Sequence, residues 1–229
     1  MAKHKLDHLT ENQILKYRAK IAAFSNSGQY KKAYQLARKL NQKYPAILLF
    51  EYLEAVFAAE DPRGLSEIEL NSRYKIASQK LLKLTRKLHG SDPLFAKSVR
   101  NEYYWFSKQP YKQYRLGVEM VKKGINKSYY SQGVGSCELS YDYALKGHYK
   151  SANKWARISI QSWKKYFKIV PNWYNSYLFF AKANGILGNE KEMMNALKTA
   201  SKISKMPLTD DIFTEIVQQV HKARKCLQR

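Results

Sequence analysis

Glycine and proline are scarce in this chain of 229 residues, which contains ten glycines and six prolines. A β-sandwich or β-barrel of this length needs many tight turns, and such turns show in a sequence as clusters of glycine, proline and asparagine. The sequence is not punctuated in that way, so its composition favours an all-α fold. Hydrophobic residues supply 45% of the chain and aromatic residues 14%, which is enough for a packed core and too much for a disordered protein.

Cysteine and long apolar runs are also in short supply. The two cysteines, Cys137 and Cys226, are too few for a disulfide framework and are typical of a reducing compartment. The most apolar stretch, 46–59, is shorter than a membrane span and contains two glutamates, so we expect a buried helix there. The start of the chain carries charge without a following apolar segment, which predicts no secretory signal. We therefore expect a cytoplasmic protein.

Negative charge is the third shortage. The chain has 18 acidic residues against 41 lysines and arginines, which gives a formal net charge of +23. Such an excess attracts nucleic acid, acidic proteins or anionic membranes. Between residues 103 and 189 the acidic residues are Glu119, Glu138 and Asp142 alone, whereas a surface that serves only solubility usually mixes both signs. The charge is consistent with plain solvation of an outer face, and the missing counter-charge predicts contact with a polyanion as the other interpretation.

Apolar residues recur at helical spacing through most of the chain, and short breaks with glycine, proline or asparagine separate the periodic segments. Glycine suits a left-handed helix C-terminus, and proline suits the first turn of the next helix. Helices joined by such short turns are expected to pack as antiparallel neighbours. The predicted helices span 10–26, 29–43, 45–60, 65–89, 93–107, 110–124, 127–146, 148–169, 172–187, 189–204 and 208–227.

One pattern of glycine, tyrosine and alanine occurs twice. The segments "GQYKKAYQLA", from Gly28, and "GHYKSANKWA", from Gly147, have tyrosine and two alanines at identical offsets from the glycine. A less complete copy begins at Gly188, and a weaker one lies in 108–124. The pattern resembles the second helix of the tetratricopeptide repeat. Its physical basis is that two closely crossing helices need a small residue opposite a large one, and a glycine to reverse the chain.

The resemblance implies an α-solenoid, in which about five antiparallel helix hairpins form a right-handed superhelix and a single domain over 1–229. The last predicted helix, 208–227, would cap this array. The hairpins are expected at about 10–43, 45–89, 93–124, 127–169 and 172–204.

The resemblance also implies a non-catalytic adaptor or regulator that binds a peptide or an acidic protein partner in a groove lined by the first helix of each hairpin. Some members of the family clamp the C-terminal carboxylate of a peptide with lysine and asparagine. The asparagine is absent from the matching positions of the first and fifth hairpins, so this clamp is not expected. The predicted groove residues are Arg18, Val134, Tyr141, Leu145, Asn175, Leu178 and Lys182.

The predicted helix 148–169 has separate apolar and cationic faces on a helical wheel. The apolar stripe runs from Tyr149 through Trp163 to Val170 and is expected to face the core. A third strip, with Trp155 and Tyr166, is expected to pack against the helix 172–187. The cationic face supports an alternative function, a nucleic-acid-binding module that contacts phosphates without reading sequence. The predicted basic face consists of Lys108, Lys112, Arg115, Lys122, Lys123, Lys150, Lys154, Arg157, Lys164, Lys165 and Lys168.

The sequence has no constellation typical of an enzyme, a cofactor site or a metal site. The segment "SQGVGSCELS" contains Gly133 and Gly135 but lacks the lysine and the preceding strand of a phosphate-binding loop. Cys137 has no histidine placed by the sequence to activate it. We therefore predict no catalytic residue, cofactor or metal, and expect Gly135 to mark a close contact inside the hairpin 127–169.

Overall fold

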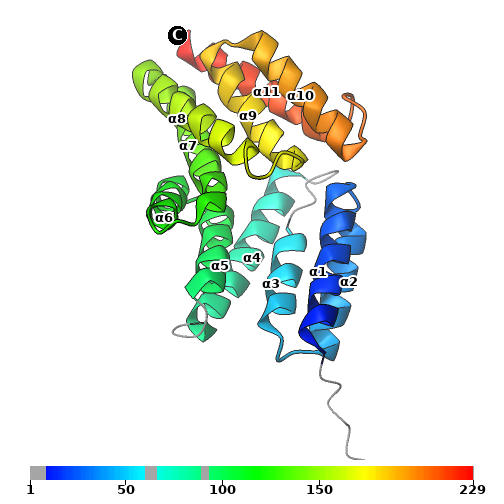
Figure 1. Ribbon diagram of the computed structural model, residues 1–229. Coiled ribbons are helices and arrows are strands. Elements are labelled where there is room, and N and C mark those ends of the chain that lie inside the picture. The colour runs from blue at the N-terminus through cyan, green and yellow to red at the C-terminus, as the bar shows by residue number, and fades with distance from the viewer. Residues whose placement is uncertain (1–8, 60–65, 89–92, 229) are drawn as a thin grey trace, which may run out of the picture. The chain divides into compact units, whose positions relative to one another are not determined.

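The protein is described by a computed structural model that covers residues 9–59, 66–88 and 93–228. These residues form eleven α-helices and one short 3₁₀ helix, with no β-strand among them (Figure 1). The all-α prediction is confirmed, and every predicted helix is present. The elements are α1 (Glu11–Asn26), α2 (Tyr30–Lys43), α3 (Leu48–Phe57), α4 (Glu67–Lys87), α5 (Pro93–Phe106), α6 (Pro110–Lys122), η1 (Asn126–Ser128), α7 (Tyr129–Leu145), α8 (Tyr149–Phe167), α9 (Tyr174–Leu187), α10 (Glu190–Ser204) and α11 (Asp211–Leu227).

The chain forms two compact units, Met1–Asp61 and Pro62–Arg229. The first unit contains α1, α2 and α3, and the second contains α4 to α11. The predicted hairpin 45–89 spans the boundary between the units. That hairpin and the single domain over 1–229 stay predictions.

The first unit is built on consecutive helix contacts. A capping box begins α1, because the Thr10 hydroxyl accepts a hydrogen bond from the Gln13 amide while the Gln13 side chain accepts one from the Thr10 amide. α1 packs against α2, and α2 packs against α3. Ile21, Ala33 and Phe50 are completely buried, one from each helix. The expected hairpin 10–43 is therefore present as α1 and α2.

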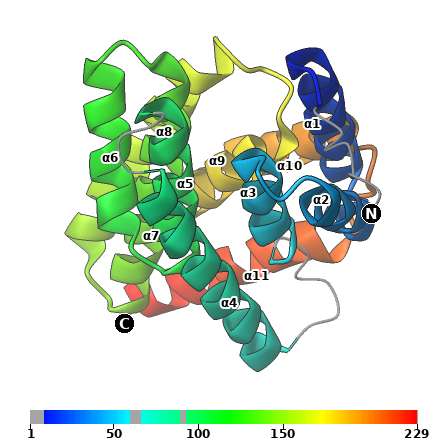
Figure 2. The same ribbon diagram turned by 90° about the horizontal axis from the view of Figure 1, so that it is seen from below.

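Neighbouring helices of the second unit pack in sequential pairs from α4 to α10 (Figure 1). The predicted hairpins 93–124, 127–169 and 172–204 correspond to the pairs α5–α6, α7–α8 and α9–α10. α7 also contacts α9, and α11 packs against both α9 and α7 (Figure 2). The second unit is thus a helical-hairpin arrangement closed at its C-terminal end by α11.

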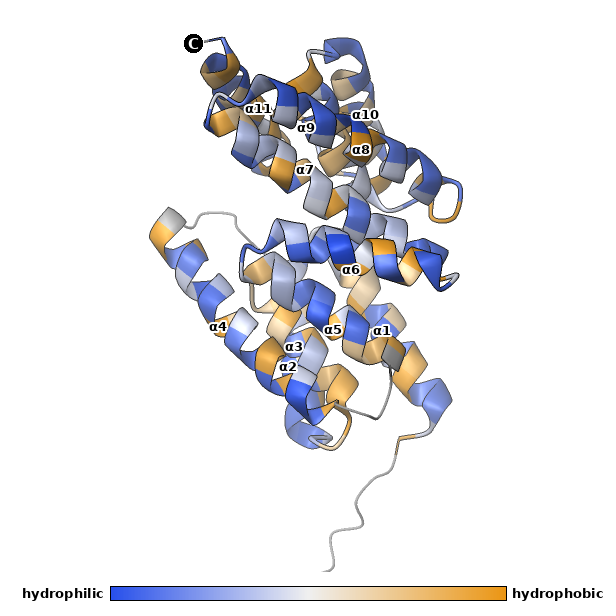
Figure 3. Cartoon of the chain, turned by 90° about the vertical axis from the view of Figure 1, so that its left-hand side faces the viewer, coloured by the Kyte–Doolittle hydropathy of each residue, from blue (hydrophilic) through white to orange (hydrophobic). Residues whose placement is uncertain are grey.

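Small residues lie where the helices meet, as the repeat pattern predicts. Ala152 and Ala156 of α8 and Ala196 of α10 are buried. The backbone φ angles of Gly147 and Gly188, which follow α7 and α9, are 72° and 86°, in the left-handed region that glycine enters without strain. Hydrophilic and hydrophobic residues alternate along the helices (Figure 3). Most helices bury one side, whereas α7 and α9 are buried on most sides because several helices pack against them.

The glycines of α7 bring two other helices close to it. A Cβ atom on Gly135 would lie 2.6 Å from both the Pro110 carbonyl oxygen and the Tyr114 amide nitrogen of α6. The expectation that Gly135 marks a contact inside the hairpin 127–169 is therefore wrong. Gly133 has that role, because its Cβ would lie 2.5 Å from the Trp163 ring of α8. The two glycines are two positions apart and therefore point to different sides of the helix.

Two expectations for α8 also need correction. Tyr149 was expected in the core stripe but is 60% exposed, because it lies in the first turn, directly after the α7–α8 connection. Trp155 was expected to pack against α9, but its ring meets Tyr114 and Tyr111 of α6, with centroids 5.0 and 6.5 Å away. Both α6 and α8 pack against α7, and the side of α8 that carries Trp155 faces back toward α6.

Candidate functional site

The predicted groove residues differ widely in exposure. Arg18 is exposed on α1 in the first unit. In the second unit, Val134 of α7 and Leu178 of α9 are buried, and Val134 packs against aromatic rings of α8. Leu145 and Asn175 are partly buried. The apolar groove residues of the second unit therefore contact other helices instead of lining an open surface.

The C-terminal helix covers part of the same region. Ala223 of α11 forms a buried cluster with Ala144 of α7 and Ile186 of α9, and Tyr141 and Leu227 border this cluster. Tyr141, a predicted groove residue, is therefore packed beside α11. The helix expected to cap the last hairpin contacts two hairpins, α7–α8 and α9–α10.

The structure brings two predicted groove residues together in a buried ionic cluster. The Lys182 ammonium of α9 donates a hydrogen bond of 2.8 Å to Oε1 of Glu138 on α7 and lies 4.0 Å from the centroid of the Tyr141 ring. Lys182 is only 3% exposed. Burial by itself lowers the pKa of its ammonium, but the Glu138 carboxylate outweighs that effect, and the net pKa is raised. Lys182 is therefore charged and held between the two helices.

Glu138 is the member of this cluster that was not predicted. It lies 44 residues from Lys182 in the chain, so no local pattern joins the two. One signal was available, because Glu138 precedes Tyr141 by three positions and therefore shares its helix face. A rare acidic residue on a face assigned to a partner groove is a candidate ion-pair partner.

Cys137 is beside this cluster and is completely buried. Its thiol donates to the Phe179 carbonyl oxygen over 3.4 Å. Burial raises the pKa of the thiol to about 12, so the reactive thiolate is not formed at neutral pH. This environment is that of a structural cysteine.

Glu102 on α5 carries a second unusual carboxyl group. Its Oε1 atom accepts a hydrogen bond of 3.1 Å from the side-chain amide of Asn101. Burial raises the pKa of Glu102 from an ordinary value of 4.5 to about 7. Between pH 4.5 and about pH 7, Glu102 is protonated in the folded chain and ionised in the unfolded chain. Stability therefore falls as the pH rises from about 4.5 to about 7.

We expect Glu102→Gln to remove this pH dependence, because glutamine resembles the protonated acid. The variant should lie close to the wild type near pH 5 and exceed its free energy of unfolding by about 3 kcal/mol at pH 8. Urea denaturation at several pH values measures the difference. A difference that is constant from pH 5 to pH 8 would show that Glu102 titrates normally.

The eleven residues of the predicted basic face are all exposed, on α6, on α8 and at the ends of these helices. Lys123 forms an ion pair with Glu119 of 3.1 Å, and Lys108 donates to the Asn71 side chain. Lys165 lies over the Tyr129 ring. Among the residues that the structure describes, Lys123 is the one member of this face with an ion pair. The face thus presents largely uncompensated positive charge.

The two helices that carry this face run in the same direction. Gly135 of α7 faces Pro110 and Tyr114 at the start of α6, whereas Gly117, further along α6, faces Gln132. α6 is therefore antiparallel to α7. α8 is also antiparallel to α7. The Ser140 hydroxyl, late in α7, donates to the carbonyl oxygen of Ala152, early in α8, and the Ser159 hydroxyl, further along α8, donates to the carbonyl oxygen of Gly133, early in α7. The Trp155 contacts with α6 show that the early turns of both helices are adjacent.

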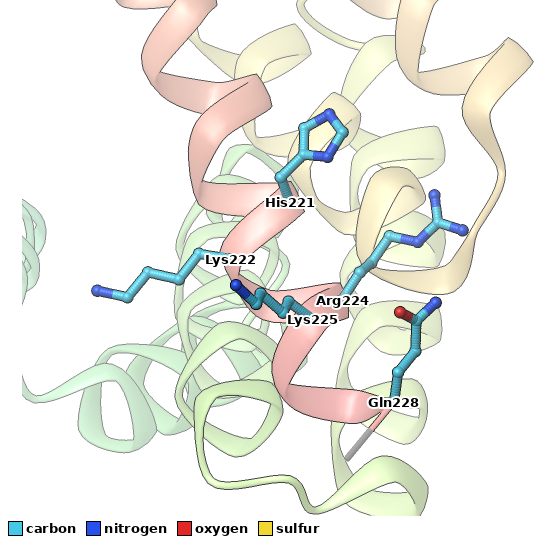
Figure 4. A pocket seen from close by; sticks show the side chains of 5 residues that line it. All are labelled: His221, Lys222, Arg224, Lys225 and Gln228. Carbon is cyan, nitrogen blue, oxygen red and sulfur yellow. The ribbon is translucent and has the colours of Figure 1, made fainter.

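A hollow of about 450 Å³ lies on α11, lined by His221, Lys222, Arg224, Lys225 and Gln228. Figure 4 shows that the Lys222 and Arg224 side chains point away from each other. The Arg224 guanidinium also donates a hydrogen bond of 2.6 Å to Glu190, and this ion pair partly neutralises its charge. The cations do not converge on one point, so the hollow is not a preformed anion site.

No family model, curated protein or solved structure matches the chain. In the described parts of the chain, no group of three or more histidine, cysteine, aspartate or glutamate side chains is placed to hold a metal ion. None of the described helices has both the length and the apolar content needed to cross a membrane. The expected absence of catalysis, cofactor and metal, and the cytoplasmic location, stay predictions.

Proposed function

We propose that the chain is a non-catalytic adaptor or regulator that binds an acidic partner through the basic face of α6 and α8. The observation that carries this proposal is the exposure of eleven cationic side chains on this face, of which Lys123 is paired with an acid among the described residues. A surface with that imbalance raises the rate of encounter with an acidic molecule and favours the complex electrostatically.

The tetratricopeptide-like α-solenoid belongs to the same proposal. Sequential pairing of α5 to α10 and the buried alanines support it. In such an array the first helices would form the partner groove, but Val134 and Leu178 are buried and α11 packs on α7 and α9. A partner can reach the outer face of α6 and α8 without moving any helix. The outer face is therefore the better supported contact surface.

Nucleic acid is a second candidate partner, and one observation favours it. Aromatic rings of α6 and α8 meet beside the basic residues of α6, and Tyr111 is substantially exposed there. Combined cationic and aromatic contacts are typical of proteins that bind single-stranded nucleic acid.

A charge-reversal experiment tests the proposed function. Lys150, Lys154, Arg157 and Lys164 of α8 are changed together to glutamate, and binding of a labelled oligoglutamate peptide and a labelled DNA duplex is titrated at two salt concentrations. We expect the wild type to bind at least one probe, and the variant to bind it more than tenfold more weakly. If four to six phosphates are contacted, the wild-type log–log salt slope for the duplex should be about −3 to −5.

The matched control reverses four exposed lysines of α10 and α11, which changes the net charge equally. These residues are Lys191, Lys198, Lys202 and Lys222. The control should keep most of the affinity if the α6–α8 face is the contact surface. Equal losses in the two variants would show that overall charge, and not this face, governs binding. Failure of the wild type to bind either probe at low salt would remove the proposed function.

A further inference from the structure

The aromatic rings that favour nucleic acid as a partner form a defined group between α6 and α8. The ring of Trp155 on α8 stands edge-on to the rings of Tyr114 and Tyr111 on α6, at interplanar angles of 82° and 86°. Tyr111 is 51% exposed, whereas Tyr114 and Trp155 are partly buried. The Tyr111 ring therefore projects from the surface and contacts the Trp155 ring, which Tyr114 contacts in turn. We call these three residues the aromatic seam.

The residues of the aromatic seam have cations as sequence neighbours on both helices. Lys112 follows Tyr111 directly, and Arg115 lies one turn further along the same face of α6. Lys154 precedes Trp155 on α8 and is exposed. An extended anionic chain crossing the seam would therefore meet the α6 cations beside Tyr111, and Lys154 is the cation next to Trp155 in the sequence of α8.

We infer that this site binds single-stranded nucleic acid, with a base stacked on Tyr111 and the flanking phosphates held by cations of α6 and α8; the inference rests on the proposed function. The reason is that a single strand presents both parts of the required chemistry, an unpaired flat base and regularly spaced phosphates. A duplex hides its base faces, and an acidic peptide offers carboxylates without a large flat ring.

The edge contact with Trp155 restricts the Tyr111 ring before a ligand arrives. A side chain held in its binding conformation loses less conformational entropy on binding than a free one. The seam offers stacking and ionic contacts, and neither reads the hydrogen-bonding edge of a base. The expected preference is therefore for single strands over duplexes, and not for one sequence.

Tyr149 provides a matched control within the same helix pair. It is 60% exposed, lies beside Lys150, and is on the side of α8 away from Trp155, since the two positions are more than 100° apart on the helical wheel. A general effect of losing an exposed tyrosine near a lysine would appear equally in Tyr149→Ala and Tyr111→Ala. Tyr111→Phe keeps the ring and its edge contact.

The experiment compares a labelled oligothymidylate of about 20 nucleotides, a duplex of the same length and an oligoglutamate peptide. It uses the full chain carrying each of these three changes and the wild type. Tyr111→Ala should weaken single-strand binding roughly 5- to 150-fold, the range measured for one stacked base. Tyr111→Phe and Tyr149→Ala should remain within about twofold of wild type, and duplex and peptide binding should not change. Circular dichroism confirms that the variants are folded.

The outcomes separate this inference from the proposed function. If Tyr111→Ala binds the single strand as tightly as wild type, or loses duplex and peptide binding to the same extent, stacking on Tyr111 is refuted. Selective peptide binding, abolished by charge reversal on α8, would also refute it while leaving the proposed function intact. If the wild type binds none of the three probes at low salt, both are wrong.

Discussion

Lys182→Met should lower the free energy of unfolding of the second unit by about 3 kcal/mol. The substitution keeps the apolar stem of the side chain but leaves the Glu138 carboxylate without the ammonium that lies 2.8 Å away. Removing one partner of a buried ion pair costs far more than the pair itself contributes, because a desolvated charge remains. Urea denaturation followed by tryptophan fluorescence measures this effect. All four tryptophans lie between residues 105 and 173 and so report on this unit.

Two companion variants show whether the isolated charge is the cause. The double variant Lys182→Met with Glu138→Leu removes both charges and should recover most of the lost stability. Lys123→Met breaks the ion pair with Glu119, in which both side chains are more than half exposed, and should leave stability nearly unchanged. If the double variant is as unstable as the sum of its two single variants, the destabilisation comes from lost packing.

Gly135→Ala should destabilise the second unit by about 2 kcal/mol. Alanine is the better helix former, so at an ordinary helix position the same change would stabilise by roughly 0.5–1 kcal/mol. Here the added methyl group would meet backbone atoms of Pro110 and Tyr114, and a backbone cannot rotate away as a flexible side chain can. α6 and α7 would have to separate. The same urea titration measures the change.

Gln161→Ala is the matched control, since Gln161 is exposed in the middle of α8. We expect it to be neutral or slightly stabilising. A neutral or stabilising Gly135→Ala would contradict the close approach of α6 to α7. If Gly135→Ala lowers the free energy of unfolding and also changes its slope against urea concentration, the native state of the variant is less compact.

The helix positions could be predicted because local chemistry determines them. Apolar spacing, short breaks and turn glycines place α8 at Tyr149–Phe167, close to the expected 148–169. The packing of α7 against α8 could also be predicted, because a turn of few residues at Gly147 leaves the two helices no other arrangement, and Ala152 and Ala156 mark the contact face.

The choice of neighbour on each remaining face could not be predicted. Periodicity shows that Trp155 belongs to a buried strip, but it does not say whether α6 or α9 covers that strip. The same limit explains Gly135, whose close partner is α6, and the Lys182–Glu138 pair, whose members are 44 residues apart. These features all depend on tertiary contacts between segments that carry no shared local signal.

The glycine-lined sides of α7 have an energetic consequence for the helices on either side of it. By letting α6 and α8 pack closely against it, α7 gathers two cationic helices in one unit, and the mutual repulsion of their like charges opposes folding of that unit. Counterions weaken this repulsion only partly, whereas a polyanion lying along both helices would neutralise it. A ligand that binds the folded form alone also shifts the folding equilibrium toward it. Binding of a polyanion to this surface and stability of the helix packing are therefore linked, and each should increase the other.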